Sequence, residues 1–132
     1  MSYIDQAFRH PSFTHEKGWD RSRSNELLEY LGDAVYELIV RKLILERYPT
    51  EDEGWQTERK NRYTNQKFQA KLARRFNLGK RLKLGRGEER TGGKEKDSIL
   101  AQTLEALIGA VFLEYGYDYA ERLLRRMLDG YI

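Results

Sequence analysis

Two apolar segments of the chain carry acidic residues at helical spacing. Residues 24–40 contain four acids and no Lys or Arg, and residues 97–121 contain five acids, again without a base. An α-helix over the first segment would place its acids, Glu26, Glu29, Asp33 and Glu37, in one stripe about 80° wide. Like charges at this spacing repel each other, and the repulsion grows when they leave water. The pattern indicates either a solvated acidic face or carboxylates that share a cation.

Two features of the first segment favour the shared cation. Leu and Val occupy many of the remaining positions, so little helix surface is left for water. Gly32 precedes Asp33 directly, and a mid-helix Gly costs about 1 kcal/mol relative to Ala, which indicates close approach by another element. The second segment offers Glu105 one turn after Gln102. If the two helices pack side by side, we expect four oxygen donors around one point: Glu29, Asp33, Gln102 and Glu105.

Composition excludes several other chemistries. The 132 residues contain no Cys and two His, which excludes disulfides, a thiolate nucleophile and a zinc–thiolate site. Hard oxygen donors suit Mg²⁺ or Mn²⁺, so metal-assisted hydrolysis is the chemistry that remains. The sequence shows no secretory leader at its start and no uninterrupted apolar run of about 18 residues. We therefore expect one cytoplasmic domain over residues 1–132 without a membrane partner.

The elements that must position these residues are predicted to be helices. Helical spacing of apolar residues predicts helices over residues 25–47, 56–76, 97–115 and 118–128. Ser24 or Asn25 is the expected N-cap of the first helix, Pro49 follows its end, and Gly79 is the expected C-cap of the second. No segment shows sustained strand alternation, so the fold is predicted to be all-α.

Cations gather between the two acidic segments. Residues 59–96 hold fourteen Lys and Arg against three acids, although the net charge of the whole chain is only +3. Such a concentration predicts a surface for a polyanion. The alternative is that many of these side chains are ordinary solubilising charges.

Three sequence blocks resemble one known family. Residues 25–35 read Asn-Glu-Leu-Leu-Glu-Tyr-Leu-Gly-Asp-Ala-Val and closely resemble the ribonuclease III signature. Residues 87–101 and 105–110 resemble that family's second and third conserved blocks, in the same order and spacing, and Glu53-Gly54 fits its acidic turn. The resemblance extends over about residues 4–128. It implies an all-α ribonuclease III endonuclease domain that forms a symmetric homodimer and acts in RNA processing.

The resemblance also implies roles for individual acids. Glu29, Asp33 and Glu105 match the family's metal-coordinating carboxylates, with Asp33 and Glu105 as the catalytic pair. Glu26 matches an acid beside the metal site, and Glu53 a further acid near it. The implied reaction is cleavage of double-stranded RNA to 5′-phosphate and 3′-hydroxyl ends with Mg²⁺ as cofactor, for which Mn²⁺ would substitute.

Binding and assembly are implied in the same way. The aromatic residue of the signature, which in the family inserts into the partner subunit, is Tyr30 here, flanked by Leu27 and Leu31. In the basic region, the residues assigned to RNA contact or to the surroundings of the site are Arg59, Lys60, Arg62, Lys94 and Lys96.

The sequence departs from the family pattern at three places. Gln102 stands where the bacterial enzymes usually have Asp. Gln keeps an oxygen that can act as a ligand but lacks the negative charge of Asp. The stretch before Ile4 is short, and no double-stranded-RNA-binding domain follows Ile132. These departures leave open a second hypothesis, a catalytically weak or inactive homologue that binds double-stranded RNA.

Overall fold

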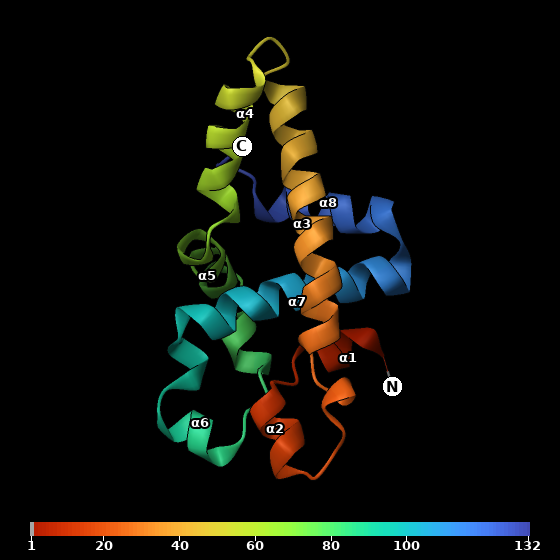
Figure 1. Ribbon diagram of the computed structural model, residues 1–132, viewed down its shortest axis with the longest axis vertical. Helices are drawn as coiled ribbons and strands as arrows, with labels where there is room; N and C mark the ends of the chain where they lie inside the picture. The colour runs from red at the N-terminus through yellow and green to blue at the C-terminus, as the bar shows by residue number, and fades with distance from the viewer. Residues whose placement is uncertain (1) are drawn as a thin grey trace.

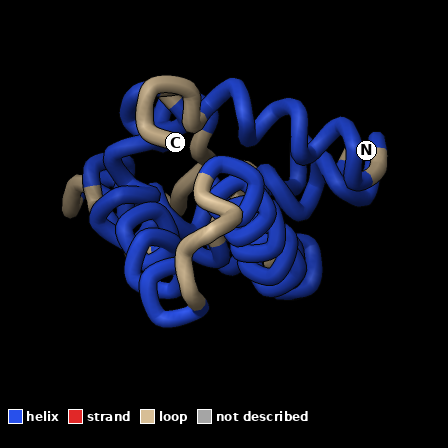
Figure 2. Tube along the Cα trace, turned by 90° about the horizontal axis from the view of Figure 1, so that it is seen from above, coloured by secondary structure: helices blue, strands red, loops and turns tan. Residues whose placement is uncertain are grey.

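Helices make up all the regular structure in residues 2–132, which the computed structural model describes. Figure 2 shows them joined by short loops. The α-helices are α1 (Tyr3–Ala7), α2 (Pro11–Glu16), α3 (Glu26–Arg47), α4 (Glu53–Thr64), α5 (Gln66–Arg75), α6 (Arg86–Arg90), α7 (Asp97–Tyr115) and α8 (Tyr117–Met127). Three short 3₁₀ helices lie between them: η1 (Arg21–Arg23), η2 (Leu78–Arg81) and η3 (Gly93–Glu95). The prediction of an all-α fold is confirmed.

Helix α7 is the centre of the fold. It crosses the long helix α3 and also packs against α5, α1 and α8 (Figure 1). By length and composition α7 could span a membrane, but 56% of its most apolar window is buried inside the protein. Its apolar character is therefore that of a core helix surrounded by other helices. Its observed bounds agree with the helix predicted over residues 97–115.

The crossing of α3 and α7 depends on two glycines. A Cβ atom added to Gly32 would lie 1.6 Å from the carbonyl oxygen of Glu105, and one added to Gly109 would lie 2.2 Å from that of Leu28. The two backbones therefore touch, with no side chain between them. The close approach expected at Gly32 is confirmed, and the partner is the α7 backbone.

A single helix over residues 56–76 was the wrong prediction, because the chain turns at Asn65. Asn65 has an extended backbone (φ −88°, ψ 158°), and its side-chain oxygen accepts from the Phe68 amide to cap the start of α5. Its side-chain NH₂ donates to the carbonyls of Asn61 and Arg62, which closes the end of α4. The side chain of Asn65 thus forms hydrogen bonds at the end of α4 and at the start of α5, which helix propensities alone do not predict.

The expected C-cap at Gly79 is also wrong. Helix α5 ends at Arg75, and the left-handed residue that follows is Asn77 (φ 57°). Asn tolerates this conformation better than most residues because its short polar side chain can bond locally. Gly79 lies within η2 instead.

The start of α3 is held by the N-terminal helices. The side chain of Asn25 is buried and donates to the Ala7 carbonyl at 3.1 Å rather than capping α3. Ser24 supplies the cap, since its hydroxyl accepts from the Glu26 amide at 3.3 Å. Residues 8–10 pair with Lys83 through two backbone hydrogen bonds, which join this region to the segment after η2.

Replacing Gly32 by Ala is expected to separate α3 from α7. Because the new methyl group meets backbone atoms that cannot rotate away, the free energy of unfolding should fall by about 3 kcal/mol or more, which exceeds the gain in helix propensity of about 1 kcal/mol. Chemical denaturation measures the difference. The matched control is Gly54→Ala in α4, whose Cβ would meet nothing closer than 3.6 Å and should stabilise the chain slightly. Equal stability of the two variants would contradict the backbone contact.

Candidate active site

Helices α3, α5 and α7 converge on a polar pocket of about 460 Å³. The four predicted oxygen donors, Glu29, Asp33, Gln102 and Glu105, all line it, together with Glu26, Tyr30, Thr64, Gln66, Gln69, Ser98 and Ala101. Glu29 and Asp33 come from one face of α3, Gln102 and Glu105 from one face of α7. The glycine crossing brings these two faces together, because Gly32 precedes Asp33 and touches the backbone of Glu105.

Three of the acids in the pocket have no ion-pair partner. Within residues 2–132, no Lys, Arg or His forms an ion pair with Glu29, Asp33 or Glu105. Burial, a hydrogen bond with Asp33 and the charges of Asp33 and Glu29 raise the pKa of Glu105 from 4.5 to about 8. Burial and then the neighbouring acids also raise the pKa of Glu29. Burial and the neighbouring acids therefore favour the protonated form of Glu105 at neutral pH.

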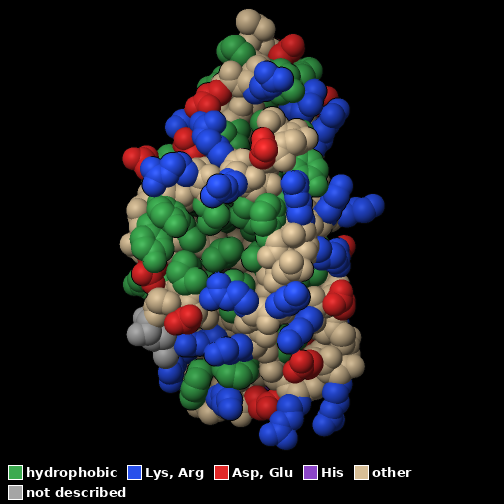
Figure 3. Space-filling view, turned by 180° about the vertical axis from the view of Figure 1, so that it is seen from behind, with side chains coloured by type: hydrophobic (Ala, Val, Ile, Leu, Met, Phe, Trp, Pro, Cys, Tyr) green, Lys and Arg blue, Asp and Glu red, His purple; other side chains and the backbone are tan. Residues whose placement is uncertain are grey.

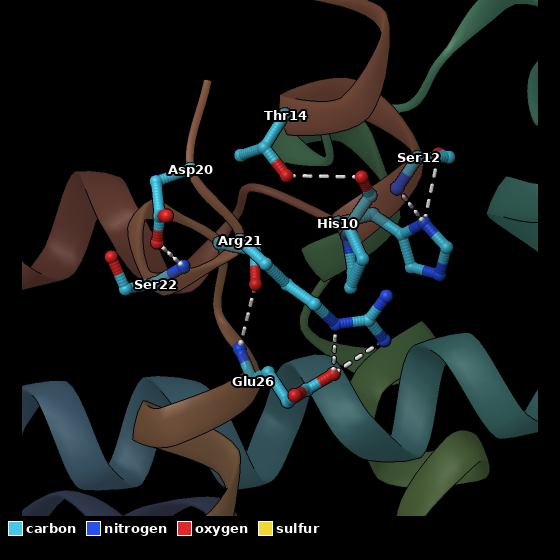
Figure 4. Close-up of polar contacts among 9 residues, drawn as sticks. His10, Ser12, Thr14, Asp20, Arg21, Ser22 and Glu26 are labelled. Atoms are coloured by element: carbon cyan, nitrogen blue, oxygen red, sulfur yellow. Dashed lines mark hydrogen bonds and ion pairs between the residues drawn. The ribbon is translucent and has the colours of Figure 1, made fainter. Parts of the chain in front are cut away.

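The two ends of the acidic stripe are neutralised. Arg21 donates two hydrogen bonds to Glu26, at 2.6 and 2.8 Å, and Figure 4 shows its guanidinium reaching that carboxylate. Glu37 accepts from Lys60 at 2.8 Å and from Arg41 at 2.9 Å. These pairs lower the pKa of both acids. All three cations lie outside residues 24–40, the segment of the sequence that contains no base, and were therefore not predicted.

The donor set of the pocket fits a divalent metal ion. Among the described residues no three Asp, Glu or His side chains form a ready metal-binding cluster, so the pocket gathers candidate oxygen donors without a preformed metal group. The three acids have no ion-pair partner within residues 2–132, and burial with the neighbouring acids raises the pKa of Glu105. Mg²⁺ and Mn²⁺ bind carboxylate and amide oxygens, and these acids lack the positive charge that such an ion supplies.

Glu53 does not join this pocket. It begins α4 and lines a separate hollow with Arg41, Leu45 and Gln56. The expectation of a further acid near the site is therefore wrong within one copy of the chain. The family's acidic turn fixes Glu53 in sequence but not the direction in which α4 leaves α3.

The predicted RNA-contacting cations divide into two groups. Lys60 is buried against Glu37, and Arg59 stacks over the rings of Tyr48 and Trp55, so both stabilise the contact of α4 with α3. Because Lys60 is buried and paired with Glu37, its assignment to RNA contact gains no support from the structure. In the second group Arg62 and Lys96 are exposed and Lys94 is half-buried; Lys94 pairs with Glu89 and Lys96 with Glu88. Figure 3, which shows the molecule from behind the view of Figure 1, has many further Lys and Arg side chains, scattered around an apolar area and among acids.

Apolar side chains on α3 remain exposed beside the pocket. Tyr30 is 81% exposed and Leu27 is 60% exposed, whereas Leu31 packs partly against the core. Leu38 and Leu45 continue the exposed apolar surface farther along α3. Tyr30 also lines the pocket. The surface assigned to dimer formation is thus free in one copy of the chain.

Several pocket residues were not predicted from the sequence, including Thr64, Gln66, Gln69, Ser98 and Ala101. Of the polar ones, Gln69 on α5 is buried, at 4% exposure, and its side chain has a lowering effect on the pKa of Glu105. A signal was present, because Gln69 precedes Leu72 and Ala73 by three and four residues and so falls on their buried helix face. Because one continuous helix was predicted over residues 56–76, Gln69 was not recognised as a pocket residue.

Comparison with known proteins agrees with the geometry. A family model described as Ribonuclease-III-like matches residues 2–130. The chain is 44% identical to Ribonuclease 3 of Heliobacterium modesticaldum over 94% of this chain and 53% of the relative. It is 42% identical to Ribonuclease 3 of Thermobifida fusca over 98% of this chain and 53% of the relative. The chain therefore spans about half the length of these relatives.

A solved structure shares the fold. The nuclease domain of ribonuclease III from Campylobacter jejuni superimposes with a TM-score of 0.88 at 37% sequence identity, covering 96% of this chain and 85% of that one. A second structure of the same nuclease domain gives a TM-score of 0.86. The family model, the curated relatives and the fold agree, and the chain belongs to the ribonuclease III family.

Proposed function

We propose that this chain is a divalent-metal-dependent endoribonuclease that cleaves double-stranded RNA to 5′-phosphate and 3′-hydroxyl ends during RNA processing. The observation that carries the proposal is the pocket in which Glu29, Asp33 and Glu105 meet without an ion-pair partner. Carboxylates are kept in this arrangement at a cost in stability, which is typical of a functional site. The protein would act in the cytoplasm.

The pocket residues have distinct tasks in this reaction. Glu29, Asp33, Gln102 and Glu105 would hold Mg²⁺, or Mn²⁺ in its place, which when bound makes water a better nucleophile and stabilises charge on the phosphate oxygens. Because its pKa is raised, Glu105 would have to ionise before its carboxylate could serve as a ligand. Partial burial of the pocket excludes water and strengthens the electrostatic interactions within it. At the rim, Arg21 neutralises Glu26 and so reduces repulsion of an approaching phosphodiester.

Exposed cations beside the pocket favour a duplex as substrate. Lys96 lies two residues before Ser98, which lines the pocket, and Arg62 two residues before Thr64, which also lines it. Cations at these positions can contact phosphates on either side of the cleaved bond. Duplex RNA is recognised mainly by shape, phosphates and 2′-hydroxyls, so we expect little sequence specificity.

A symmetric homodimer would supply two such pockets. The Campylobacter jejuni nuclease domain has a region involved in dimer formation, and in this chain Tyr30 and Leu27 are large, apolar and exposed. An isologous interface uses the same patch on both copies and would present one pocket to each RNA strand. Because Tyr30 also lines the pocket, dimer formation would order the rim of the pocket.

Gln102 supports the second candidate, a homologue that binds double-stranded RNA with weak or no cleavage. An amide contributes an oxygen ligand but no charge, which lowers the attraction for a cation. Incubation of a long RNA duplex with the protein in Mg²⁺ and in Mn²⁺ separates the two candidates. Cleavage in either metal supports the enzyme, and binding without cleavage in both supports the homologue.

The first prediction concerns the catalytic pair. Asp33→Asn or Glu105→Gln should reduce cleavage of duplex RNA by about 100-fold or more at saturating Mg²⁺, because each removes a charged ligand that stabilises the transition state by several kcal/mol. Binding of RNA and the melting temperature should not fall. Glu46→Gln, an exposed acid at the far end of α3, is the control and should cleave normally. Full turnover in either pocket variant would refute the assignment.

The second prediction concerns pH. Glu105 binds its proton more tightly in the folded chain (pKa about 8) than in the unfolded one (4.5), so between these values the folded state holds more protons. Stability of the metal-free protein should therefore fall as pH rises through this window. Melting temperatures in EDTA at pH 5 and pH 8.5 measure the loss, which should be smaller in Glu105→Gln. Added Mg²⁺ should reverse the loss at the higher pH, and identical pH profiles of the two proteins would contradict the raised pKa of Glu105.

The third prediction concerns the dimer. If Tyr30 is the central interface residue, Tyr30→Ala should weaken dimerisation by about 2–4 kcal/mol, or about 30-fold to 1,000-fold in the dissociation constant. Light scattering should give about twice 15.7 kDa for the wild-type chain and a lower mass for the variant. Tyr119→Ala, an exposed aromatic residue on α8, is the control. A wild-type monomer at micromolar concentration would overturn the homodimer.

A further inference from the structure

Arg9 is a buried arginine without a counter-charge. It is 6% exposed, and within residues 2–132 no Asp or Glu forms an ion pair with it. Its guanidinium also donates no hydrogen bond within these residues. Because none of their fully buried side-chain nitrogens lacks a partner, the guanidinium must be the part of Arg9 that still reaches the surface. A charge so far removed from water is normally paired, so Arg9 presents unused donors that suit an anion.

Trp19 supports this guanidinium in place of an acid. The Arg9 guanidinium lies 5.5 Å from the centre of the Trp19 ring, and the Arg23 guanidinium lies 4.1 Å from it. Trp19 in turn meets Phe13 edge to face, at a distance of 5.7 Å between ring centres. Cation–π contacts of this kind stabilise a cation. They do not neutralise its charge, and they leave its N–H donors free.

Two lysines add to the positive charge. The ammonium groups of Lys17 and Lys83 lie 5.5 and 6.0 Å from the centre of the neighbouring phenyl ring. The acids close by in the sequence are engaged elsewhere, because Asp20 caps η1 and Glu16 binds the start of α6. We name the four cations and the two aromatic residues together the Trp19 cluster: Arg9, Phe13, Lys17, Trp19, Arg23 and Lys83. In the part of the chain that the structure describes, no ion pair reaches any of its four cations.

Hydrogen bonds hold the cluster in one arrangement. The Trp19 amide donates to the Thr14 carbonyl at 2.9 Å, which ties the indole to the end of α2. The Gln6 side chain donates to the carbonyls on either side of Arg23, at 3.1 and 2.9 Å, and so fixes η1. The cations are therefore gathered before any ligand arrives, which reduces the entropy lost on binding.

The Trp19 cluster lies at the rim of the proposed active site. The Arg9 carbonyl accepts from the Asn25 amide at 2.8 Å, and the next residue, Glu26, lines the pocket. Arg21, which belongs to the same short helix η1 as Arg23, donates to Glu26. Helix η1 contacts both α2 and α3 (Figure 4). A nucleic-acid strand that leaves the pocket over Glu26 therefore meets the cluster next.

From this geometry we infer that the Trp19 cluster binds a backbone phosphate of the RNA next to the cleaved bond, with the Arg9 and Arg23 guanidinium groups as donors. The inference rests on the proposed function, because it takes duplex RNA as the ligand of the adjacent pocket. A guanidinium matches two phosphate oxygens in one plane, and a phosphodiester supplies the negative charge that the cluster lacks. Arg23 already covers the Trp19 ring at 4.1 Å, which favours a phosphate over a stacked base as the ligand.

The first test measures how strongly the full chain binds a short RNA duplex, in EDTA so that nothing is cleaved. Arg9→Met keeps an apolar side chain in the buried position and removes the guanidinium. Because a hydrogen bond to a charged group is lost, the dissociation constant should rise about 10-fold. The slope of its logarithm against the logarithm of the salt concentration should fall by about 1, the value for one phosphate contact.

Two further variants make this test decisive. Arg23 is exposed, so Arg23→Met covers the case in which Arg9→Met does not fold, and the same two changes are expected. Arg122→Met is the matched control, because this exposed guanidinium lies 5.6 Å from the Tyr119 ring on α8, and Figure 1 shows α8 and α2 on opposite sides of α7. It should leave affinity and slope unchanged. Wild-type affinity and slope in Arg23→Met and in a folded Arg9→Met would overturn the inference.

Fluorescence of Trp19 reports on the cluster directly. The chain contains two Trp, so Trp55→Phe leaves Trp19 as the only indole. Duplex RNA should shift its emission with a midpoint at the dissociation constant, because the guanidinium groups on the ring would turn toward the phosphate. Inorganic phosphate offers the same chemistry from a free source, and it should bind more weakly and be displaced by RNA. Phosphate that stays bound when RNA is added, or an emission that RNA does not alter, would overturn the inference.

Cleavage assays distinguish failure of this inference from failure of the proposed function. If the wild-type chain binds the duplex through Arg9 and Arg23 but cleaves it in neither Mg²⁺ nor Mn²⁺, the proposed function fails and the phosphate site stands. If the wild-type chain cleaves the duplex and both arginine variants bind it normally, the phosphate site fails and the proposed function stands.

Discussion

Contact between the backbones of α3 and α7 at Gly32 and Gly109 is the constraint on which both the core and the pocket depend. Packed helices usually lie 8–10 Å apart, with side chains between them, but here a Cβ at either glycine would strike a backbone carbonyl. Because Asp33 follows Gly32 and Glu105 supplies one of those carbonyls, the acids are drawn together by the same contact. A wider crossing would preserve two amphipathic helices and still lose the pocket.

The negative charge of the acids near this crossing must be offset, but cations neutralise only some of the acids along α3. Glu26 and Glu37 receive cations from η1, α3 itself and α4. Among residues 2–132, Glu29 and Asp33, which lie between them, receive none, and the pKa of Glu105 opposite them is raised. Neutralising the ends of the stripe limits the repulsion to the few groups around one point. The unpaired acids are therefore those that we propose as metal ligands.

The sequence predicts the helices that bury continuous apolar faces and the acids that those helices carry. The bounds of α7 agree with the prediction, and α3 differs by one residue. The break at Asn65 escapes such reasoning because one side chain caps two helices, a matter of local hydrogen bonding rather than of periodicity. Lys60 was not foreseen because an ion pair across the fold has no fixed sequence spacing. Arg21 was not foreseen because it lies just before the base-free segment, residues 24–40. Glu53 escapes it because a turn in the sequence does not specify the path of the helix that follows.

Amides form a large share of the pocket wall. Gln66, Gln69 and Gln102 stand among four acids, and an amide can donate to a carboxylate or offer an oxygen without altering the net charge. This separates two tasks that a cation would combine, orientation of the acids and neutralisation of their charge. In the site that we propose, the acids would keep their demand for positive charge. Affinity for a divalent ion would then depend on the arrangement of amides and acids as well as on the number of carboxylates.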